Sequence, residues 1–363
     1  MKSSFGQSVN ISITGESHGE ALVAVLSGLT PGIKIDNDYI RHCLSQRAPA
    51  GKISTPRKEA DEFEILSGVF EGFTTGTPIT ILIRNTNTKS KDYSEMASTP
   101  RPGHADFTAE EKYHGFQDYR GGGHFSGRIT AVLVAAGAIA RVALKKKGIE
   151  IGTHVAKCGG VADRDFENIS EDIDALNNKY FAVLDDNCAE KMQAEIIKAA
   201  EEGDSIGGIL ETAVKGLPAG LGEPWFDSME SVLAHFLFSI PGIKGVEFGT
   251  GFAVADMKGS QVNGGLRIKD GKVTPVDDLS GGINGGITNG DILKFRCAVR
   301  PTPTIFKEQN TVDMKKLTEK TMSAKGRHDP AIVHRVRAVV DAAVSLCLCD
   351  MMAQRYGTDW ANV

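Results

Sequence analysis

An apolar segment at residues 129–140, ITAVLVAAGAIA, places the strongest constraint on the fold of this 363-residue chain. It carries no charge and belongs to a longer stretch, 128–147, that ends in three lysines followed by Gly148. Lysines in a last turn and a glycine stop are typical of a helix C-terminus. The apolar segment is shorter than the roughly 20 residues that span a bilayer. We therefore expect a helix buried in a protein core and no membrane partner.

A glycine-rich segment leads directly into this helix. Residues 101–128 read RPGHADFTAEEKYHGFQDYRGGGHFSGR and contain three consecutive glycines, Gly121 to Gly123. A glycine-rich turn before a helix leaves backbone N–H groups directed at one point, with the positive end of the helix dipole behind them. Such a turn can bind an anion, and Arg128 adds a full charge to it. The alternative is a flexible loop in front of a buried helix.

Hydrophobic periodicity and glycine or proline breaks predict the remaining elements. Residues 280–290, SGGINGGITNG, are expected to be a loop because they are too rich in glycine for a packed element. Strands and helices are mixed, with strand pairs like those of hairpins, which favours the α+β class. Strands are expected at 9–14, 21–26, 63–70, 78–83, 149–161, 206–214, 244–252 and 292–299. Further helices are expected at 36–45, 188–202, 228–239 and 331–354.

Charge and cysteine content limit the partners and the compartment. The net charge of −5 argues against a general basic surface for nucleic acid, so any anionic ligand must be held by locally clustered Arg and Lys. No cysteine pair has the spacing of a zinc ribbon, which indicates buried thiols in a reducing compartment. The N-terminus does not resemble a signal peptide, and we expect a cytoplasmic protein. The six cysteines are Cys43, Cys158, Cys188, Cys297, Cys347 and Cys349.

Polar side chains collect at three further breaks between predicted elements. Gly15 to Gly19, GESHG, places Ser17 and His18 in a glycine-bracketed turn between two strands, where backbone can approach a ligand closely. A basic segment follows the first helix, with Arg47, Lys52, Arg57 and Lys58. Residues 325–330, KGRHDP, bring Arg327, His328 and Asp329 to the start of the last helix. Taken singly, these are a reverse turn, a solvated loop and a helix start.

Together these motifs resemble the chorismate synthase family. GESHG, RPGHAD, RGGGHFSGR, KGRHDP and the segment Glu59 to Ile81, EADEFEILSGVFEGFTTGTPITI, occur in the family's order along essentially the whole chain. One such motif is weak, whereas five in register are specific. The resemblance implies an α+β fold, a β-α-β sandwich of antiparallel sheets with helices on the outside. It also implies one domain over residues 1–363, assembled as a homotetramer.

The activity that the resemblance implies is that of a carbon–oxygen lyase acting on phosphates. Members convert 5-enolpyruvylshikimate 3-phosphate to chorismate by a 1,4-anti elimination, the last common step of the shikimate pathway to the aromatic amino acids. They require reduced FMN although the reaction has no net redox change. NADPH is the candidate reductant of the flavin, but nothing in the sequence marks a separate reductase domain. No metal is implied.

The resemblance also assigns roles by position. His18 corresponds to the histidine that protonates the leaving phosphate, His104 to one beside flavin N1, and Asp329 to the carboxylate that helps flavin N5 lose the substrate's proton. Ser17 and Ser126 fall on serines beside these groups. FMN contacts are expected from His124, Phe125, Ser126, Pro241, Gly242, Gly285, Arg300, Pro301, Thr302, Pro303, Thr304 and Arg327. Substrate contacts are expected from Arg47, Lys52, Arg101, Arg128 and Arg327.

These roles agree with the physical chemistry of the residues. A substrate with one phosphate and two carboxylates requires several cations in one pocket of a net-acidic protein, and arginine stays charged where water is excluded. Histidine titrates near the working pH, so His18 suits a proton donor. A cationic His104 would stabilise the negative charge of a reduced flavin.

Two segments depart from the family pattern. Residues 46–50 read QRAPA where the family often has RRRPG, and residues 124–128 read HFSGR where it often has RSSAR. The first change removes cationic side chains near the substrate, and the second places histidine and phenylalanine near the flavin. The contacts at 46–52 and 124–125 are therefore the ones that the resemblance predicts least well.

Two other functions fit parts of the same pattern. A metal-dependent phosphohydrolase could use His18, His104, His124 and Asp329 as ligands, but H-x-x-x-H, H-x-H and D-x-D spacings do not support a preformed site. A non-catalytic flavin or nucleotide module would explain the glycines but not the basic cluster, and no Walker P-loop is present. The remaining histidines are expected to be structural. They are His42, His114, His154, His235 and His334.

Overall fold

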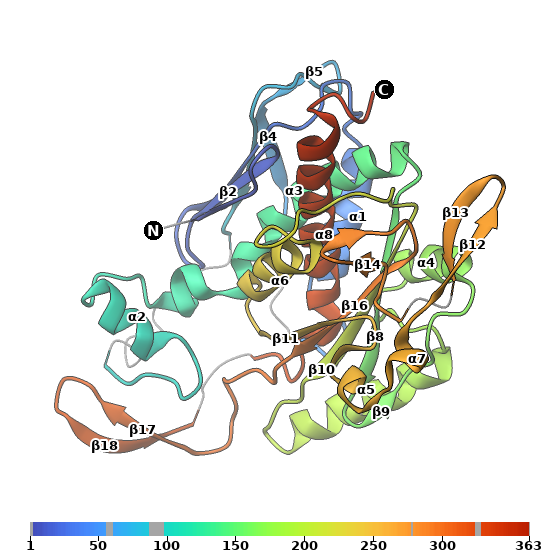
Figure 1. The fold of residues 1–363 in the computed structure, drawn as a ribbon. Coiled ribbons are helices and arrows are strands. Elements are labelled where there is room, and N and C mark those ends of the chain that lie inside the picture. The colour runs from blue at the N-terminus through green and yellow to red at the C-terminus, as the bar shows by residue number, and fades with distance from the viewer. Residues whose placement is uncertain (1–2, 56–60, 87–97, 277–278, 324–327, 363) are drawn as a thin grey trace.

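Two five-stranded antiparallel sheets enclose a layer of helices (Figure 1). The computed structural model describes residues 3–55, 61–86, 98–276, 279–323 and 328–362. The first sheet has the order β1 (Ser4–Phe5), β2 (Asn10–Thr14), β3 (Ala21–Ser27), β7 (Ile79–Arg84) and β4 (Phe63–Ser67). The second has the order β11 (Ile243–Phe248), β16 (Leu293–Val299), β10 (Gly208–Lys215), β8 (Glu150–Cys158) and β9 (Val161–Ala162).

The two longest helices, α3 (Thr130–Lys146) and α8 (Val333–Tyr356), lie between the sheets. Helix α3 packs on β3 and β7 of the first sheet, and α8 packs on β8 and β10 of the second. Two shorter helices, α1 (Asn37–Arg47) and α6 (Met229–Ser239), contact this pair. The apolar helix expected from the sequence is thus a core helix, because a helix without a polar face has to be covered on all sides.

Only part of the helical content lies outside the sandwich, which refines the expected arrangement. Helices α4 (Ile169–Asn177) and α5 (Asp186–Glu201) pack on the second sheet. Gly152 of β8 faces Ile173 of α4, whereas the neighbouring Thr153 bonds to Asp341 of α8. Successive residues of a strand point to opposite faces. Strand β8 is therefore covered on both sides. The mixed α+β class and the antiparallel sheets are as expected.

Most predicted elements occur within a few residues of their expected bounds, and four predictions were wrong in detail. Gly159 and Gly160 have positive φ and turn the chain back, so 149–161 is not one strand but β8 and the antiparallel β9. Gly68, with φ +80°, ends β4 and separates it from β5 (Val69–Phe70), so 63–70 is not one strand. Beyond β11 the chain turns into the short helix η4 (Gly251–Asp256) instead of continuing the strand to residue 252. The glycine-rich stretch 280–290 is packed, because it contains the hairpin of β14 (Ile283–Asn284) and β15 (Ile287–Thr288).

Small hairpins and helices complete the structure. Hairpins form between β5 and β6 (Phe73–Thr74), between β12 (Gly265–Lys269) and β13 (Lys272–Val276), and between β17 (Gln309–Asp313) and β18 (Thr318–Met322). The other helical segments are α2 (Asp106–Tyr113), η2 (Arg120–Phe125), η3 (Gly127–Ile129) and α7 (Gly259–Val262).

Helix α3 and the cysteines are both parts of the core. One helix in the described part of the chain, Gly127–Lys146, is long and apolar enough to cross a membrane, and most of it is buried inside the protein. All six cysteines are free, and five are buried. Burial raises the pKa of Cys158 and Cys297 to about 12, so these thiols stay protonated and behave as small apolar groups.

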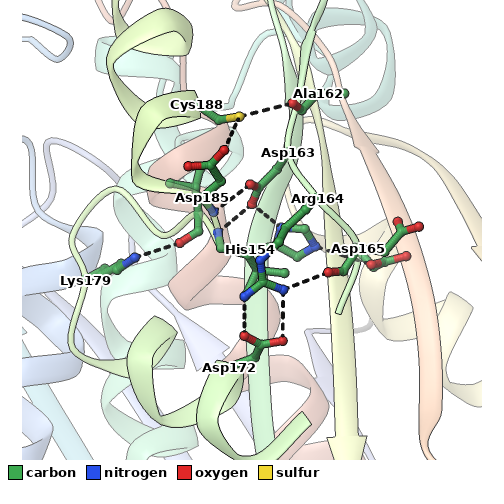
Figure 2. A network of polar contacts seen from close by, with 12 residues as sticks. His154, Ala162, Asp163, Arg164, Asp165, Asp172, Lys179, Asp185 and Cys188 are labelled. Atoms are coloured by element: carbon green, nitrogen blue, oxygen red, sulfur yellow. Dashed lines mark hydrogen bonds and ion pairs between the residues drawn. The ribbon is translucent and has the colours of Figure 1, made fainter. Parts of the chain in front are cut away.

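A buried histidine on the second sheet is held between two carboxylates (Figure 2). His154 Nδ1 lies 2.7 Å from Asp163, its Nε2 lies 3.3 Å from Glu211, and the side chain is fully buried. Burial alone would lower the pKa of His154, but hydrogen bonds to the two carboxylates outweigh it and hold this pKa above its ordinary value. His154 is therefore an imidazolium that fixes β8 to β10 and to the segment after β9.

Helices α3 and α8 approach each other closely at Gly137. A Cβ atom at this position would lie 2.5 Å from the Cα atom of Ala342. Gly137→Ala should therefore destabilise the protein by about 1–3 kcal/mol through overpacking, despite the roughly 1 kcal/mol by which alanine is the better helix former. Thermal unfolding followed by circular dichroism measures this. The matched control is Gly259→Ala in α7, where the nearest atom is 3.9 Å away and we expect no loss. Equal melting temperatures for the wild type and Gly137→Ala would refute the close approach.

The raised pKa of His154 predicts a pH-dependent contribution to stability. A group whose folded-state pKa is raised contributes fully below its unfolded value of about 6.5 and loses that contribution as pH rises through the folded-state pKa. The difference in unfolding free energy between wild type and His154→Gln should therefore be larger at pH 6 than at pH 9. Urea unfolding at both pH values tests this, with the exposed His114→Gln as control. A difference that grows with pH would show that His154 is buried neutral.

Candidate functional site

The glycine loop, Gly121 to Gly123, lies between the two histidines singled out from the sequence. A Cβ atom at Gly121 would collide with the ring of His18, and one at Gly122 would lie 3.1–3.2 Å from Cε1 and Nε2 of His104. The three glycines have φ values of +60°, +86° and +52°, a region that favours glycine. Gly121 and Gly122 are neighbours, and the Cα atoms of neighbouring residues are 3.8 Å apart. The two imidazoles therefore pack against adjacent residues of the same loop.

Backbone and side-chain bonds fix this loop to the turn that carries His18. The backbone N–H of Ser17 donates to the Gly123 carbonyl oxygen at 3.1 Å. His124 Nδ1 lies 2.8 Å from the carbonyl oxygen of Gly15, which it reaches as a donor. The GESHG turn and the glycine loop are therefore bonded to each other at two points. His124 holds the loop in place, which is the structural consequence of the histidine that departs from the family pattern.

The basic residues predicted around the substrate include a buried pair that shares one carboxylate. Arg47, from the end of α1, and Arg128, at the start of α3, both bond to Asp61, and all three side chains are at most 7% exposed. Burial raises the pKa of Asp61, but the two guanidinium groups outweigh it and lower this pKa overall. Asp61 is therefore an anion held between two guanidinium groups. Asp61 was missed in the sequence, where it lies unremarked in the segment Glu59 to Ile81.

Asp329 is bound to the same region from the other side. Its carboxylate accepts from the Thr55 backbone N–H at 2.9 Å and from Arg335 at 2.6 Å. Arg335 in turn donates to the Arg47 carbonyl oxygen at 2.8 Å. The start of α8 is thereby connected to the end of α1, and Asp329 is connected to the arginine cluster.

The extended segment 300–304 is hydrogen-bonded to several other residues that the sequence predicts in the site. The Arg300 guanidinium donates to the Gly103 carbonyl oxygen at 2.8 Å. The Arg300 backbone N–H donates to the Gly242 carbonyl oxygen at 2.9 Å. Pro303 packs beside Gly103. The Thr302 hydroxyl donates to the Asp329 carbonyl oxygen at 2.7 Å. The structure therefore brings the Pro241–Gly242 turn, the loop before His104 and Asp329 onto one segment.

The other predicted residues are placed less uniformly. Ser126 accepts from the Arg128 backbone N–H and begins η3, while Phe125 is 38% exposed and lies 6.2 Å from the ring of Tyr113. Lys52 is exposed. Gly285 lies in the turn of the β14–β15 hairpin, which packs against the start of α6. Arg57, Lys58 and Arg327 lie outside the described residues. Gln46, in the QRAPA segment that departs from the family pattern, donates to the Asn177 carbonyl oxygen. From that segment, Arg47 is the residue that bonds to Asp61.

His104 has a buried ionic neighbour of its own. Its Nδ1 lies 2.7 Å from Asp106 Oδ1, and Arg101 donates to both carboxylate oxygens of Asp106 at 2.7 Å. Burial would raise the pKa of Asp106, but the hydrogen bonds from Arg101 and His104 lower it well below its ordinary value. Asp106 is therefore an anion at neutral pH. In the sequence, only its place in RPGHAD distinguishes Asp106.

Two observations show that the loop region fits an additional bound group. Ser17 is 1% exposed, its hydroxyl has no hydrogen-bond partner among the described residues, and a Cβ atom at Gly121 would lie 2.8 Å from it. A buried polar atom without a partner is rare unless a ligand or water supplies one. A cavity of about 190 Å³ adjoins the loop, and Asp106, Gly122 and Phe125 are among its lining residues. Polar groups that converge around bare backbone suit a planar, charged ligand.

The phosphohydrolase alternative finds little support in this arrangement. Within the described ranges no three His, Cys, Asp or Glu side chains converge as a metal site would require. Two of the ligands that it needs, His124 and Asp329, are bonded to Gly15 and to Arg335.

Comparison with known proteins gives a consistent result over nearly the whole chain. The sequence profile of the family described as chorismate synthase matches residues 9–353. Chorismate synthase of Methanosarcina barkeri is 45% identical over 351 residues, covering 96% of this chain and 95% of the relative. That of Aeropyrum pernix is 43% identical over 355 residues, covering 98% and 93%. A solved structure described as a crystal structure of chorismate synthase is similar with a TM-score of 0.77 and 28% identity, covering 98% and 94%.

The shared carboxylate of the arginine cluster predicts a large effect of one substitution. Asp61→Asn removes the buried carboxylate that Arg47 and Arg128 share, which should cost about 3–5 kcal/mol. Thermal and urea unfolding measure the loss. The control is Asp38→Asn, which removes the exposed partner of Arg41 on α1 and should change stability by less than about 0.5 kcal/mol. Similar effects of the two substitutions would show that Asp61 does not neutralise the pair.

Proposed function

The chain belongs to the chorismate synthase family, and on that premise we propose which of its residues bind and convert the substrate. The activity of the family is the elimination of phosphate from 5-enolpyruvylshikimate 3-phosphate to give chorismate, and the chain is a lyase of this type. Its place in the shikimate pathway to the aromatic amino acids follows from that reaction and remains part of the proposal. The supporting observation is that His18 and His104 lie against adjacent glycines of one loop.

We assign the leaving phosphate to the side of the loop that carries His18. A histidine titrates near neutral pH, so His18 can hold the proton that phosphate takes as it leaves. The Ser17 hydroxyl, buried and without a partner, can donate a hydrogen bond to the same group. Arg47 and Arg128 supply a positive field that water does not screen, because both are almost fully buried. Lys52 and Arg327 are further proposed substrate contacts.

Reduced FMN is the proposed cofactor, and when bound it supplies an electron-rich ring that assists loss of phosphate without net oxidation. His104 would place a positive charge beside that ring. Asp329, bonded to Thr55 and Arg335, is the proposed carboxylate for the substrate's proton. Segments 124–126, 241–242 and 300–304, with Arg327, would line the remaining contacts. Gly285 is retained as a proposed contact, although its hairpin packs against α6.

The proposal extends to assembly and location. The β12–β13 hairpin exposes Leu266, Ile268 and Val273, and its register pairs Ile268 with Val273 on one face. An unpartnered apolar face supports association with further copies, which fits a homotetramer. Free, buried cysteines fit the reducing cytoplasm. One apolar cluster runs from Val9 to Ala361 and supports a single domain over residues 1–363. NADPH remains the candidate reductant, and we propose no nucleic-acid or membrane partner.

An anaerobic assay tests the proposed function. Purified protein is mixed with 5-enolpyruvylshikimate 3-phosphate and either dithionite-reduced or oxidised FMN, and chorismate and phosphate are measured. We expect both products with reduced FMN only. His18→Gln should lower kcat by about 10²–10⁴-fold, the range for loss of a general acid, while flavin binding is retained.

Each contrary result has a distinct meaning. Phosphate release without flavin that a chelator abolishes would favour the hydrolase. Tight binding of FMN without turnover would indicate a flavoprotein with a different substrate. Unchanged kcat in His18→Gln would remove the proton-donor role while leaving the lyase activity intact. The exposed His114→Gln serves as the matched control.

A further inference from the structure

Asp106 is hydrogen-bonded both to Arg101 and to the imidazole ring of His104. Arg101 bonds to Asp106 three times, through its backbone N–H at 3.0 Å, through Nε at 2.7 Å and through Nη2 at 2.7 Å. The side chains of Arg101 and Asp106 are 7% and 10% exposed, and that of His104 is 17% exposed. A bidentate, buried arginine–carboxylate pair is a rigid structure.

The distances decide which nitrogen of His104 carries a proton. Nδ1 lies 2.7 Å from Asp106 Oδ1 and 3.0 Å from Arg101 Nη2. An anionic oxygen so close to Nδ1 requires a proton between them, because two acceptors at that distance repel. Arg101 Nη2 donates one hydrogen to the same Oδ1 atom, and a second hydrogen directed at Nδ1 would not relieve the repulsion between an unprotonated Nδ1 and the anionic oxygen 2.7 Å away. Nδ1 is therefore the protonated nitrogen.

The other nitrogen of His104 faces the glycine loop. A Cβ atom on Gly122 would lie 3.2 Å from Nε2, so Nε2 faces the backbone of this glycine. We propose that Asp106, held by Arg101, is a positioning residue that keeps Nδ1 of His104 permanently protonated, so that His104 exchanges its proton with bound groups only through Nε2. This inference rests on the proposed role of His104 and adds which of its two ring nitrogens exchanges the proton.

Arg101 then has a function other than the one expected from the sequence. Its guanidinium uses Nε and Nη2 on Asp106 and is buried, so its charge is neutralised before any substrate arrives. We assign it to the support of Asp106 in place of a direct substrate contact. Carboxylates that orient an active-site or metal-bound histidine act in the same way, and their loss typically lowers activity about 10–100-fold.

Asp106→Asn is the informative substitution because the amide has one acceptor where the carboxylate has two. The position of Oδ2 faces the backbone N–H and Nε of Arg101, and neither can become an acceptor. The Oδ1 position faces one fixed donor, Arg101 Nη2, and His104, whose proton can move. The amide oxygen should therefore occupy the Oδ2 position, where both donors are fixed, which turns the amide NH₂ toward His104 Nδ1. His104 can relieve the clash only by moving its proton to Nε2, so the substitution should reverse the tautomer.

The tautomer is measured by magic-angle-spinning NMR of full-length protein with ¹⁵N-labelled histidine rings. His104 is assigned from the spectrum of His104→Gln. We expect a protonated Nδ1 and an unprotonated Nε2 for neutral His104 in the wild type, and the reverse in Asp106→Asn. The control is Asp186→Asn, which removes the exposed partner of Lys179 and should leave the His104 signals unchanged. A wild-type His104 protonated at Nε2 would overturn the proposal, and this measurement does not require a folded variant at residue 106.

Kinetics separate positioning from substrate binding. In the assay with reduced FMN, Asp106→Asn should lower kcat about 10–100-fold with little change in KM. Arg101→Gln should do the same, and the double variant should be no worse than Asp106→Asn alone, because Arg101 acts through Asp106. A raised KM for Arg101→Gln that persists in the double variant would identify Arg101 as a substrate contact and overturn its assignment. Full activity in His104→Gln would overturn the role of His104 itself, independently of the NMR result.

Discussion

The close contact between α3 and α8 at Gly137 is the interaction on which the rest of the structure depends. It sets the thickness of the helical layer, and both sheets pack on that layer, the first through α3 and the second through α8. The ends of the same helices carry the site. Arg128 precedes α3, Asp329 precedes α8, and Arg47 closes α1. The geometry of the site is thus a consequence of helix packing in the core, where backbone positions are least free to vary.

Electrostatics at the site follows one pattern in two places. Arg47 and Arg128 share Asp61, and Arg101 and His104 share Asp106. In both groups two basic side chains are held by one buried carboxylate. A lone buried charge would be costly, so the carboxylate makes burial of the arginines tolerable. A protein with a net charge of −5 can thereby hold several basic side chains at one location.

The glycine loop packs against His104 of one charged group and leads along the chain into Arg128 of the other. Its three residues have backbone conformations that favour glycine, and side chains at the first two would fill the space that the histidine rings occupy. The two imidazoles consequently differ in their surroundings while remaining close. His18 lies beside the unpartnered Ser17 hydroxyl, and His104 is fixed by Asp106. Different surroundings are what allow two residues of the same type to perform different proton transfers.

The sequence by itself determined the α+β class, the position of most elements and the identity of the loops that carry His18, His104 and Asp329. These depend on local periodicity, on glycine positions and on motifs, all of which are readable along the chain. Only the tertiary structure decided that the longest helices lie inside the sandwich, that residues 280–290 pack as a hairpin, and that Asp61 and Asp106 hold the basic side chains. Which face of an element is covered, and which carboxylate meets which arginine, depends on contacts between distant segments. Asp61, for example, lies 14 positions from Arg47 and 67 from Arg128, so its two partners become visible only when the chain is folded.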